Sequence, residues 1–368
     1  MRKIIIIILS ILIGILNGCS KTKIVAKTFY LDEAFSIVPV VTILEKESLF
    51  INENIQKELS EITNHLDNKF NVFKENSMIS KVNNEAFLKD VLVDNEFLNV
   101  LKTAIRVSDE TKINNVAMYD ITIYSIWEEW NFKDNYYVHH NYCNPPSEEV
   151  IKQKLPLVDI KNILINDQYK SIYFTKEGTK IDLGSIVKGY AADLIYEKLI
   201  DMGFNNFLID VGGNIVTSGN NIGTKRNWKV GITKPFSYNE EIGYVEVSNE
   251  KTSVVTSGIY ERYILSINDE GKETMYHHIL NPITGYPIEN ELISVSIFSK
   301  ESIRGDAYST AIFSMGLEKG MEFVNGNNEI DAIFITKNKE IYISEGIKGF
   351  IANEEIYKDN YKIIYNLL

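Results

Sequence analysis

The sequence predicts an α+β fold. Apolar, β-branched runs typical of strands are scattered among amphipathic helical segments, without the regular β-α-β order of a doubly wound sheet. The chain has 368 residues, of which 45% are hydrophobic and 24% charged, which is sufficient for a packed core. No repeat or low-complexity linker divides its body, so we expect two intimately packed α+β lobes with mixed or antiparallel sheets.

The composition excludes several classes of protein. The formal net charge is -12, and an acidic chain is a poor general binder of nucleic acid, since that affinity comes largely from Lys and Arg. The two cysteines are too few for a disulfide framework or a four-cysteine zinc site.

The N-terminus has the features of an export signal. Arg2 and Lys3 precede an almost uninterrupted apolar run over 4–16, shorter than the ~20 residues of a membrane-spanning helix. The run ends at Gly18-Cys19, which resembles the bacterial lipoprotein box. We expect a signal peptide over 1–18, lipidation of Cys19, a tether over 19–35 and one domain over 36–368. The protein would then sit on the extracytoplasmic face of the bacterial cell membrane. An uncleaved anchor helix is the alternative.

The expected elements follow from residue spacing, in chain order. In 54–70 the apolar residues recur at helical intervals, and 97–107 repeats this pattern. Helices are also expected over 191–202 and 306–315, ended by Gly203 and Gly316. Runs rich in β-branched residues predict strands over 38–44, 207–211, 228–232, 263–267, 293–298, 332–336 and 341–344. We expect an irregular insertion over 133–150; His139 and His140 there, with Cys143, are interpreted as structural because a metal would lack a fourth ligand.

Polar and glycine-rich clusters interrupt the apolar segments of the sequence and suggest chemistry at a phosphate. Asp306 and Thr310 are four residues apart on an expected helix, so their oxygens face one way. A carboxylate with a hydroxyl is hard-oxygen ligation suited to Mg²⁺, which usually also takes phosphate oxygens. Lys188 lies at an expected helix start, where a cation and free N–H groups hold a phosphate. His278 precedes a Pro-x-Thr-Gly turn and is a candidate acid or base.

Each of these residues also has a purely structural interpretation. Asp306 would cap its helix, with Thr310 as a packed hydroxyl. Asp182, before a glycine, would form an Asx turn. Lys188 would be a solvated surface lysine, and His278 a structural histidine.

Taken in order, the clusters resemble the ApbE family of bacterial FAD:protein FMN transferases, from roughly Thr28 to Val324. The strings that carry this resemblance are Asp-Leu-Gly-Ser-Ile-Val-Lys-Gly-Tyr from Asp182, Thr-Ser-Gly-Ile-Tyr-Glu-Arg from Thr256, and His-Ile-Leu-Asn-Pro-Ile-Thr-Gly-Tyr-Pro from His278. The resemblance implies Mg²⁺-dependent transfer of FMN from FAD to a Thr or Ser hydroxyl of an acceptor protein, with release of AMP. The acceptor would be an exported or membrane redox protein.

The resemblance also implies the roles of individual residues. The FAD contacts would be Met118, Tyr119, Asp120, Asp182, Lys188 and Ile279. The metal site would be Ser185, Asp306 and Thr310, with His278 and Asp306 in the catalytic step. The sequence departs from the family pattern in several places. Ile303 stands where many relatives have a second metal-binding Asp, Asn281 replaces an Asp, and Phe73 replaces a Tyr but keeps its stacking surface. The family's early Met-Gly-Thr segment is not recognisable near Ile37.

Two other functions use the same flavin site. One is a metal-dependent FAD pyrophosphatase, in which water is the acceptor and FMN and AMP are the products. The other is a lipoprotein that only binds or stores FAD; the Asp306 and Thr310 pair argues against it, because storage needs no metal at the pyrophosphate.

Overall fold

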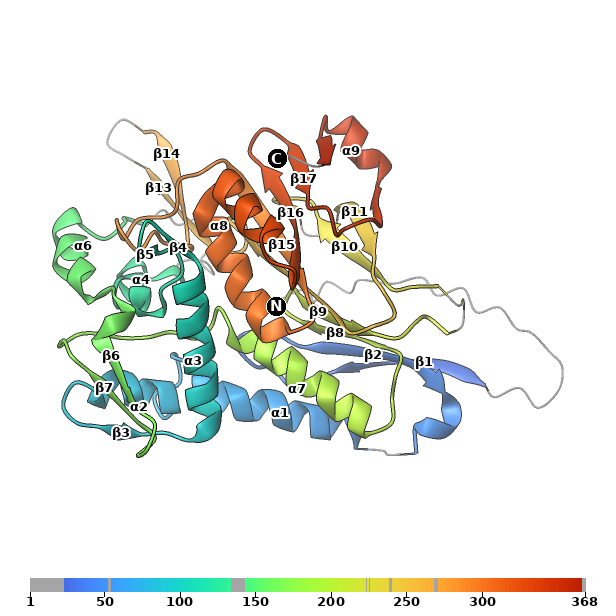
Figure 1. Ribbon diagram of the computed structural model, residues 1–368, viewed down its shortest axis with the longest axis horizontal. Helices are drawn as coiled ribbons and strands as arrows, with labels where there is room; N and C mark the ends of the chain where they lie inside the picture. The colour runs from blue at the N-terminus through green and yellow to red at the C-terminus, as the bar shows by residue number, and fades with distance from the viewer. Residues whose placement is uncertain are drawn as a thin grey trace.

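The protein is described by a computed structural model over residues 23–51, 54–133, 143–222, 224, 226–237, 240–267 and 271–365. The expected signal peptide over 1–18 and Cys19 lie outside the described residues, as do His139 and His140. Strands and helices are mixed without β-α-β order, which confirms the α+β class (Figure 1). Within the described residues, no helix is both long enough and apolar enough to span a bilayer.

A nine-stranded sheet forms the centre of the fold, in the strand order β1-β2-β8-β9-β12-β15-β16-β17-β19. All its neighbouring pairs are antiparallel except β17 and β19, so the sheet is mixed, as expected. The strands are β1 (Ile24–Tyr30), β2 (Val40–Lys46), β8 (Phe207–Val211), β9 (Asn214–Ser218), β12 (Thr252–Gly258), β15 (Leu292–Ser299), β16 (Ile330–Thr336), β17 (Glu340–Ile343) and β19 (Lys362–Tyr365).

Smaller sheets surround this one. A three-stranded sheet joins β10 (Lys229–Thr233), β11 (Glu241–Glu246) and β18 (Phe350–Ala352), and another joins β3 (Val91–Leu92), β7 (Ser171–Phe174) and β6 (Ile163–Asn166). Two hairpins pair β4 (Lys112–Ile113) with β5 (Val116–Ala117) and β13 (Tyr263–Ile267) with β14 (Glu273–His277).

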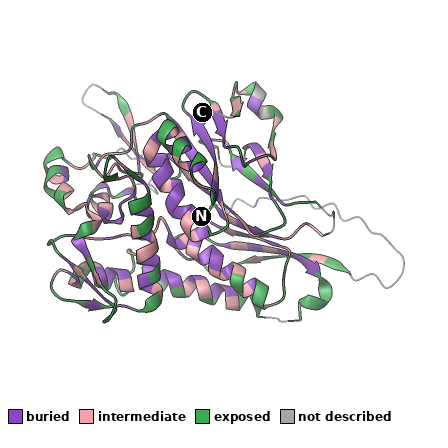
Figure 2. Ribbon diagram, viewed as in Figure 1, coloured by how far each residue is buried: buried purple, intermediate pink, exposed green. Residues whose placement is uncertain are grey.

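The helices are α1 (Ile55–Phe70), α2 (Met78–Glu85), α3 (Asn95–Glu110), α4 (Tyr124–Trp130), α6 (Glu148–Lys154), α7 (Val187–Asp201), α8 (Ser302–Asn325) and α9 (Glu354–Lys358). Alternation along the strands of the large sheet builds a core on each face. In β16, Ala332 and Phe334 join the cluster that includes α1, α7 and α8, whereas Ile333 and Ile335 join the cluster of β10 and β11. Figure 2 shows the buried residues gathered along α8 and the strands beneath it.

Three expectations about the elements are wrong in detail. Residues 24–30 are not part of a tether but form strand β1, which pairs along its whole length with β2. Helix α8 begins at Ser302 rather than at Asp306, and it continues beyond Gly316, which is a break with φ 79 and ψ 177 inside the helix. The irregular insertion expected over 133–150 extends only to Ser147, because the regular helix α6 begins at Glu148; residues 134–142 of the insertion lie outside the described residues. β1 is mostly exposed, so its sequence lacks the apolar alternation of a half-buried strand. The first N–H groups of α8 bond to Asp193 of another helix, so no local capping residue marks where α8 begins.

Helices α7 and α8 cap each other. Asp193 of α7 accepts hydrogen bonds from the N–H groups of Ser302 (3.0 Å) and Ile303 (2.8 Å), at the start of α8. Asp306 of α8 accepts a hydrogen bond of 2.9 Å from the N–H of Gly189, in the first turn of α7. Each carboxylate therefore satisfies N–H groups that the other helix cannot satisfy itself.

Gly189 sets how closely the two helices approach. A Cβ atom at this position would lie 2.1 Å from the carbonyl oxygen of Ser302 and 2.9 Å from Cβ of Asp306. Because both obstacles belong to a buried helix, a larger residue must move α8 rather than a flexible side chain.

We therefore expect Gly189→Ala to lower the free energy of unfolding by about 1–3 kcal/mol, the usual cost of overpacking. Urea unfolding followed by circular dichroism measures it. Gly326→Ala is the matched control: its nearest atom would be 3.4 Å away, so the change should stay within about 0.5 kcal/mol. Equal stability of the two variants would contradict the close-approach argument.

Candidate functional site

One cavity of about 1470 Å³ brings together all the site residues that the sequence predicts within the described chain. It lies where β8 and β12 end and β2 begins, beside the first turn of α7 and the part of α8 from Asp306 to Ser314. The predicted residues that line it are Met118, Tyr119, Asp120, Asp182, Ser185, Lys188, His278, Ile279, Asp306 and Thr310. This co-location is an observation; their individual roles stay predictions.

Asp306 lies at the centre of the polar lining. Its side chain is almost fully buried, and the Gly189 N–H occupies Oδ2. Its Oδ1 makes a 3.8 Å ion pair with Nζ of Lys188, which also donates to Oδ1 of Asn214 at 3.3 Å. The capping role considered for Asp306 is thus present, but it serves α7 and not its own helix. A cap that leaves one carboxylate oxygen on the cavity side also leaves that oxygen available to a ligand.

Hydroxyl groups surround this carboxylate. One turn after Asp306, the Thr310 hydroxyl lies 3.3 Å from Oγ of Ser257, which is 2.7 Å from Oγ of Ser309. On the facing loop, the Ser185 hydroxyl lies 2.9 Å from the phenol oxygen of Tyr119. Burial raises the pKa of Tyr119, so its phenol stays protonated and can donate to Ser185.

Two predicted FAD contacts use carboxylate oxygens to build local turns. Asp120 accepts hydrogen bonds from Thr122, through its N–H at 2.9 Å and its hydroxyl at 2.5 Å, and from the Ile160 N–H at 3.2 Å. Asp182 accepts from the Gly184 N–H at 2.9 Å, which is the Asx turn considered for it. Both line the cavity, so we interpret their carboxylates as shaping its wall at least as much as binding a ligand.

The centre of the cavity is acidic. Asp182, Asp210 and Asp306 line it together with the cations Lys188 and Arg262. Burial raises the pKa of Asp182 and Asp210, and the nearby cations only partly oppose this effect. A doubly charged pyrophosphate entering such a site meets carboxylates as well as cations, so its binding would be helped by a divalent cation.

The donor set fits Mg²⁺ in a site completed by phosphate. Asp306 supplies a carboxylate and Thr310 a hydroxyl, while Ile303 packs against the core and offers no second carboxylate. Across the described part of the chain, no group of three His, Cys, Asp or Glu side chains could hold a metal. These residues alone therefore make no complete cage, which suits a cation that keeps waters and takes substrate oxygens.

His278 is held with one ring nitrogen available. Its Nδ1 lies 3.0 Å from the carbonyl oxygen of Arg262, which can only accept, so Nδ1 carries the proton and Nε2 has the lone pair. Burial, together with the nearby positive charge of Arg262, lowers the pKa of His278 from its ordinary 6.5 to about 3. The imidazole is therefore neutral at pH 7 with a lone pair on Nε2, and the same low pKa makes it a weaker base than a free imidazole. Its neighbour His277, bonded to the Ile288 carbonyl at 2.9 Å, is structural.

Several lining residues were not assigned any role from the sequence. Arg262 is the last residue of a quoted motif but was given no role, and Asp210 stands two residues before Gly212-Gly213, the signal that could have indicated it. Trp127 and Trp228 were also given no role, and both line the cavity. Sequence spacing gives no information on which face of a core aromatic meets an internal space.

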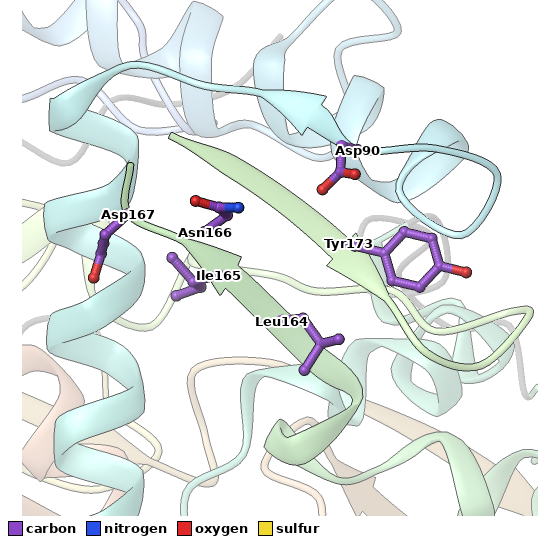
Figure 3. A pocket seen from close by; sticks show the side chains of 6 residues that line it. All are labelled: Asp90, Leu164, Ile165, Asn166, Asp167 and Tyr173. Carbon is purple, nitrogen blue, oxygen red and sulfur yellow. The ribbon is translucent and has the colours of Figure 1, made fainter. Parts of the chain in front are cut away.

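A second, smaller hollow of about 640 Å³ lies at the sheet of β3, β7 and β6 (Figure 3). Its lining contains the carboxylates Asp90 and Asp167, but no Lys, Arg or His. Asp90 accepts a hydrogen bond from the Ser171 hydroxyl at 3.0 Å, and Asp167 pairs with Lys102. Both carboxylates thus have structural partners. Unlike the main cavity, this hollow has no lining cation that could bind a phosphate.

The low pKa of His278 predicts how stability depends on pH. Between pH 6.5 and about 3 the unfolded chain binds a proton at this position and the folded protein does not, so the folded state loses stability as pH falls. His278→Gln removes this dependence. Relative to wild type, the variant should gain up to about 2 kcal/mol on going from pH 7.5 to pH 5, in urea unfolding. The contributions of His277 and of the buried carboxylates are common to both proteins and cancel. Parallel stability curves would contradict the burial of the neutral imidazole.

Comparison with known proteins matches both the sequence and the fold of this chain to one family. Residues 34–334 match the model of the ApbE family. A relative from Klebsiella pneumoniae (strain 342), named FAD:protein FMN transferase, is 37% identical over 206 residues, which cover 56% of this chain and 60% of that protein. A relative of the same name from Treponema pallidum is 29% identical over 286 residues, covering 74% of this chain and 75% of that protein.

Solved structures agree. The ApbE protein from Thermotoga maritima superimposes with a TM-score of 0.73 and 29% identity, covering 89% of this chain and 98% of that one. The flavin transferase ApbE from Vibrio cholerae has a TM-score of 0.71 at 21% identity, covering 90% of this chain and 99% of that one, and shows the shared fold. Because the family model matches residues 34–334, which is most of the chain, the chain belongs to the ApbE family.

Proposed function

We propose that this protein transfers FMN from FAD to a Thr or Ser hydroxyl of an acceptor protein and releases AMP. The observation that carries the proposal is the meeting of Asp306, Thr310 and Lys188 in one cavity that has room for a dinucleotide. The names of the Klebsiella and Treponema relatives support the same reaction.

In the proposed reaction, this chain's residues bind, orient and accept a proton. Lys188 and Arg262 contact the pyrophosphate of FAD, and the aromatic side chains of the cavity hold its rings. The acceptor oxygen bonds to the phosphorus of the FMN half while the bond from that phosphorus to the oxygen of AMP breaks. The hydroxyl proton passes to Nε2 of His278, and AMP leaves. Positioning accounts for much of the rate in this class of reaction.

Mg²⁺ is the proposed metal. Asp306 and Thr310 would hold it, with Ser185 contributing through its main-chain carbonyl. When bound, the cation supplies neutralisation of charge on the pyrophosphate. With one carboxylate from the protein, Mg²⁺ and FAD should each strengthen the binding of the other, by the same factor in both directions.

The acceptor and the cellular location follow from the N-terminus. If Cys19 is lipidated, the enzyme stays at the extracytoplasmic face of the membrane, and its acceptor is an exported or membrane redox protein that reaches the same face. Lipidation of Cys19 would thereby limit the acceptor proteins to those in the same compartment, without Cys19 touching them.

Cys19→Ser tests the anchor. We expect the variant to accumulate as a precursor or to be released into the soluble fraction, because the lipid attachment point is lost. Membrane fractionation and gel migration measure this. Identical behaviour of the variant and the wild type would exclude the lipoprotein interpretation.

Asp306→Asn tests the metal and the reaction together. The amide oxygen can still accept from the Gly189 N–H, so the fold should survive, whereas the anionic ligand is lost. We expect AMP release to fall by at least a hundredfold, and calorimetric titration to show that FAD no longer strengthens Mg²⁺ binding. Asp193→Asn is the matched control, because it alters the reciprocal cap without lining the cavity.

The same incubation separates the alternatives. FAD, Mg²⁺ and a candidate acceptor are mixed, and in-gel flavin fluorescence is read beside AMP release. Labelled acceptor with AMP supports transfer, free FMN with AMP indicates a pyrophosphatase, and neither product indicates storage. Undiminished turnover in EDTA, or in the Asp306→Asn protein, would exclude the magnesium mechanism.

A further inference from the structure

Aromatic side chains form one wall of the cavity. The ring of Trp127 lies 6.2 Å from that of Phe73 and 6.0 Å from that of Tyr124, between ring centroids. Phe132 packs behind Trp127 at 5.4 Å, and Nζ of Lys133 lies 3.9 Å from the centre of the Phe73 ring. All five residues line the cavity, and we call them the aromatic wall. A wall of this kind binds a planar ring by stacking.

Trp127 also contacts the segment that carries the candidate base. Its indole N–H donates a hydrogen bond of 3.2 Å to the carbonyl oxygen of His278. The other polar contacts of His278 converge on Arg262, whose carbonyl accepts from both the His278 N–H at 3.1 Å and Nδ1 at 3.0 Å. Arg262 therefore holds the imidazole directly, and Trp127 holds the main-chain carbonyl of the same residue.

The three tryptophans of the chain differ in this respect. Trp130 lies on the same helix and donates its indole N–H to the Gly285 carbonyl at 3.0 Å, but it is only 1% exposed and does not line the cavity. Trp228 lines the cavity but donates to the Ser218 carbonyl at 2.8 Å, away from His278. Trp127 alone among them combines a cavity surface with a bond to the candidate base.

We propose that Trp127 is a positioning residue that couples the seating of a planar ring of FAD to the placement of His278. The ring stacks beside Phe73 on Trp127, and the indole N–H holds the main chain of His278 so that Nε2 meets the acceptor hydroxyl. This inference rests on the proposed function and adds to it a link between substrate binding and the base.

Two substitutions separate the two halves of this role. Trp127→Phe keeps an aromatic surface and removes the N–H donor, so kcat for AMP release should fall roughly fivefold to tenfold with the FAD dissociation constant changed less than twofold. Trp127→Leu also removes the stacking surface, so the FAD dissociation constant should rise roughly fivefold or more. A purely structural role would not divide kcat from binding in this way.

Trp130→Phe is the matched control, because it removes one indole-to-carbonyl hydrogen bond from the same helix outside the cavity. It should lower the unfolding temperature and leave kcat and FAD affinity unchanged. Tryptophan fluorescence gives a readout without turnover: FAD should quench the wild type strongly, and Trp127→Phe should lose more of the quenched signal than Trp228→Phe. Mg²⁺ is present at one concentration throughout.

The outcomes distinguish this inference from the proposed function. If the wild type binds no FAD or releases no AMP, the proposed function fails. If the wild type does both, but Trp127→Phe keeps full kcat, or loses no more than Trp130→Phe, the coupling is wrong. Quenching carried mainly by Trp228 would likewise overturn the placement of the ring on the aromatic wall.

Discussion

The contact of α7 with α8 at Gly189 is the constraint on which the site depends. The helices meet so closely there that no side chain fits, and each supplies a carboxylate to the N-terminal N–H groups of the other. Neither helix begins with a side-chain cap from its own N-cap residue. The two helix starts are therefore stable only as a pair, and the pair fixes Lys188, Asp306 and Thr310 relative to one another. A structural hydrogen bond and the proposed metal site share the carboxylate of Asp306.

This sharing explains the electrostatics of the cavity. Asp306 is buried, and its carboxylate accepts from the Gly189 N–H in the first turn of α7 and pairs with Lys188. Asp182 and Asp210 also accept hydrogen bonds from backbone N–H groups of glycines, and burial raises the pKa of both. Lys188 at the start of α7 can attract a negatively charged ligand, and the Asp306 carboxylate on α8 can attract a cation. Bringing the two together neutralises both, which is the physical basis for coupled binding.

The sequence predicted what depends on local pattern. The α+β class, the helices near 55–70 and 187–201, and the hairpin of β16 and β17 follow from periodicity and turn residues, and the motif residues meet in one cavity. It did not predict β1, whose exposed surface lacks the apolar alternation of a half-buried strand. Nor did it predict that Asp306 caps a different helix, because a cap across 117 positions leaves no local signature. Trp127 was missed for the related reason that stacking and a main-chain bond both come from tertiary contacts.

The break at Gly316 divides α8 into two segments that pack against different elements. Two side chains from the segment before β15 bond the backbone groups that the break leaves without helical partners. Asn290 donates to the Phe313 carbonyl, and Glu291 accepts from the Leu317 N–H. The segment before the break carries Asp306 and Thr310, the proposed metal ligands, and is bound to α7, whereas Gly320 after the break packs beside Phe334 of β16. Adding one residue to an unbroken helix would rotate everything beyond it by about 100°. The break at Gly316 gives the outer segment a register of its own, so its buried residues Gly320, Met321 and Val324 meet the core without setting the rotation of Asp306 and Thr310 on the inner segment.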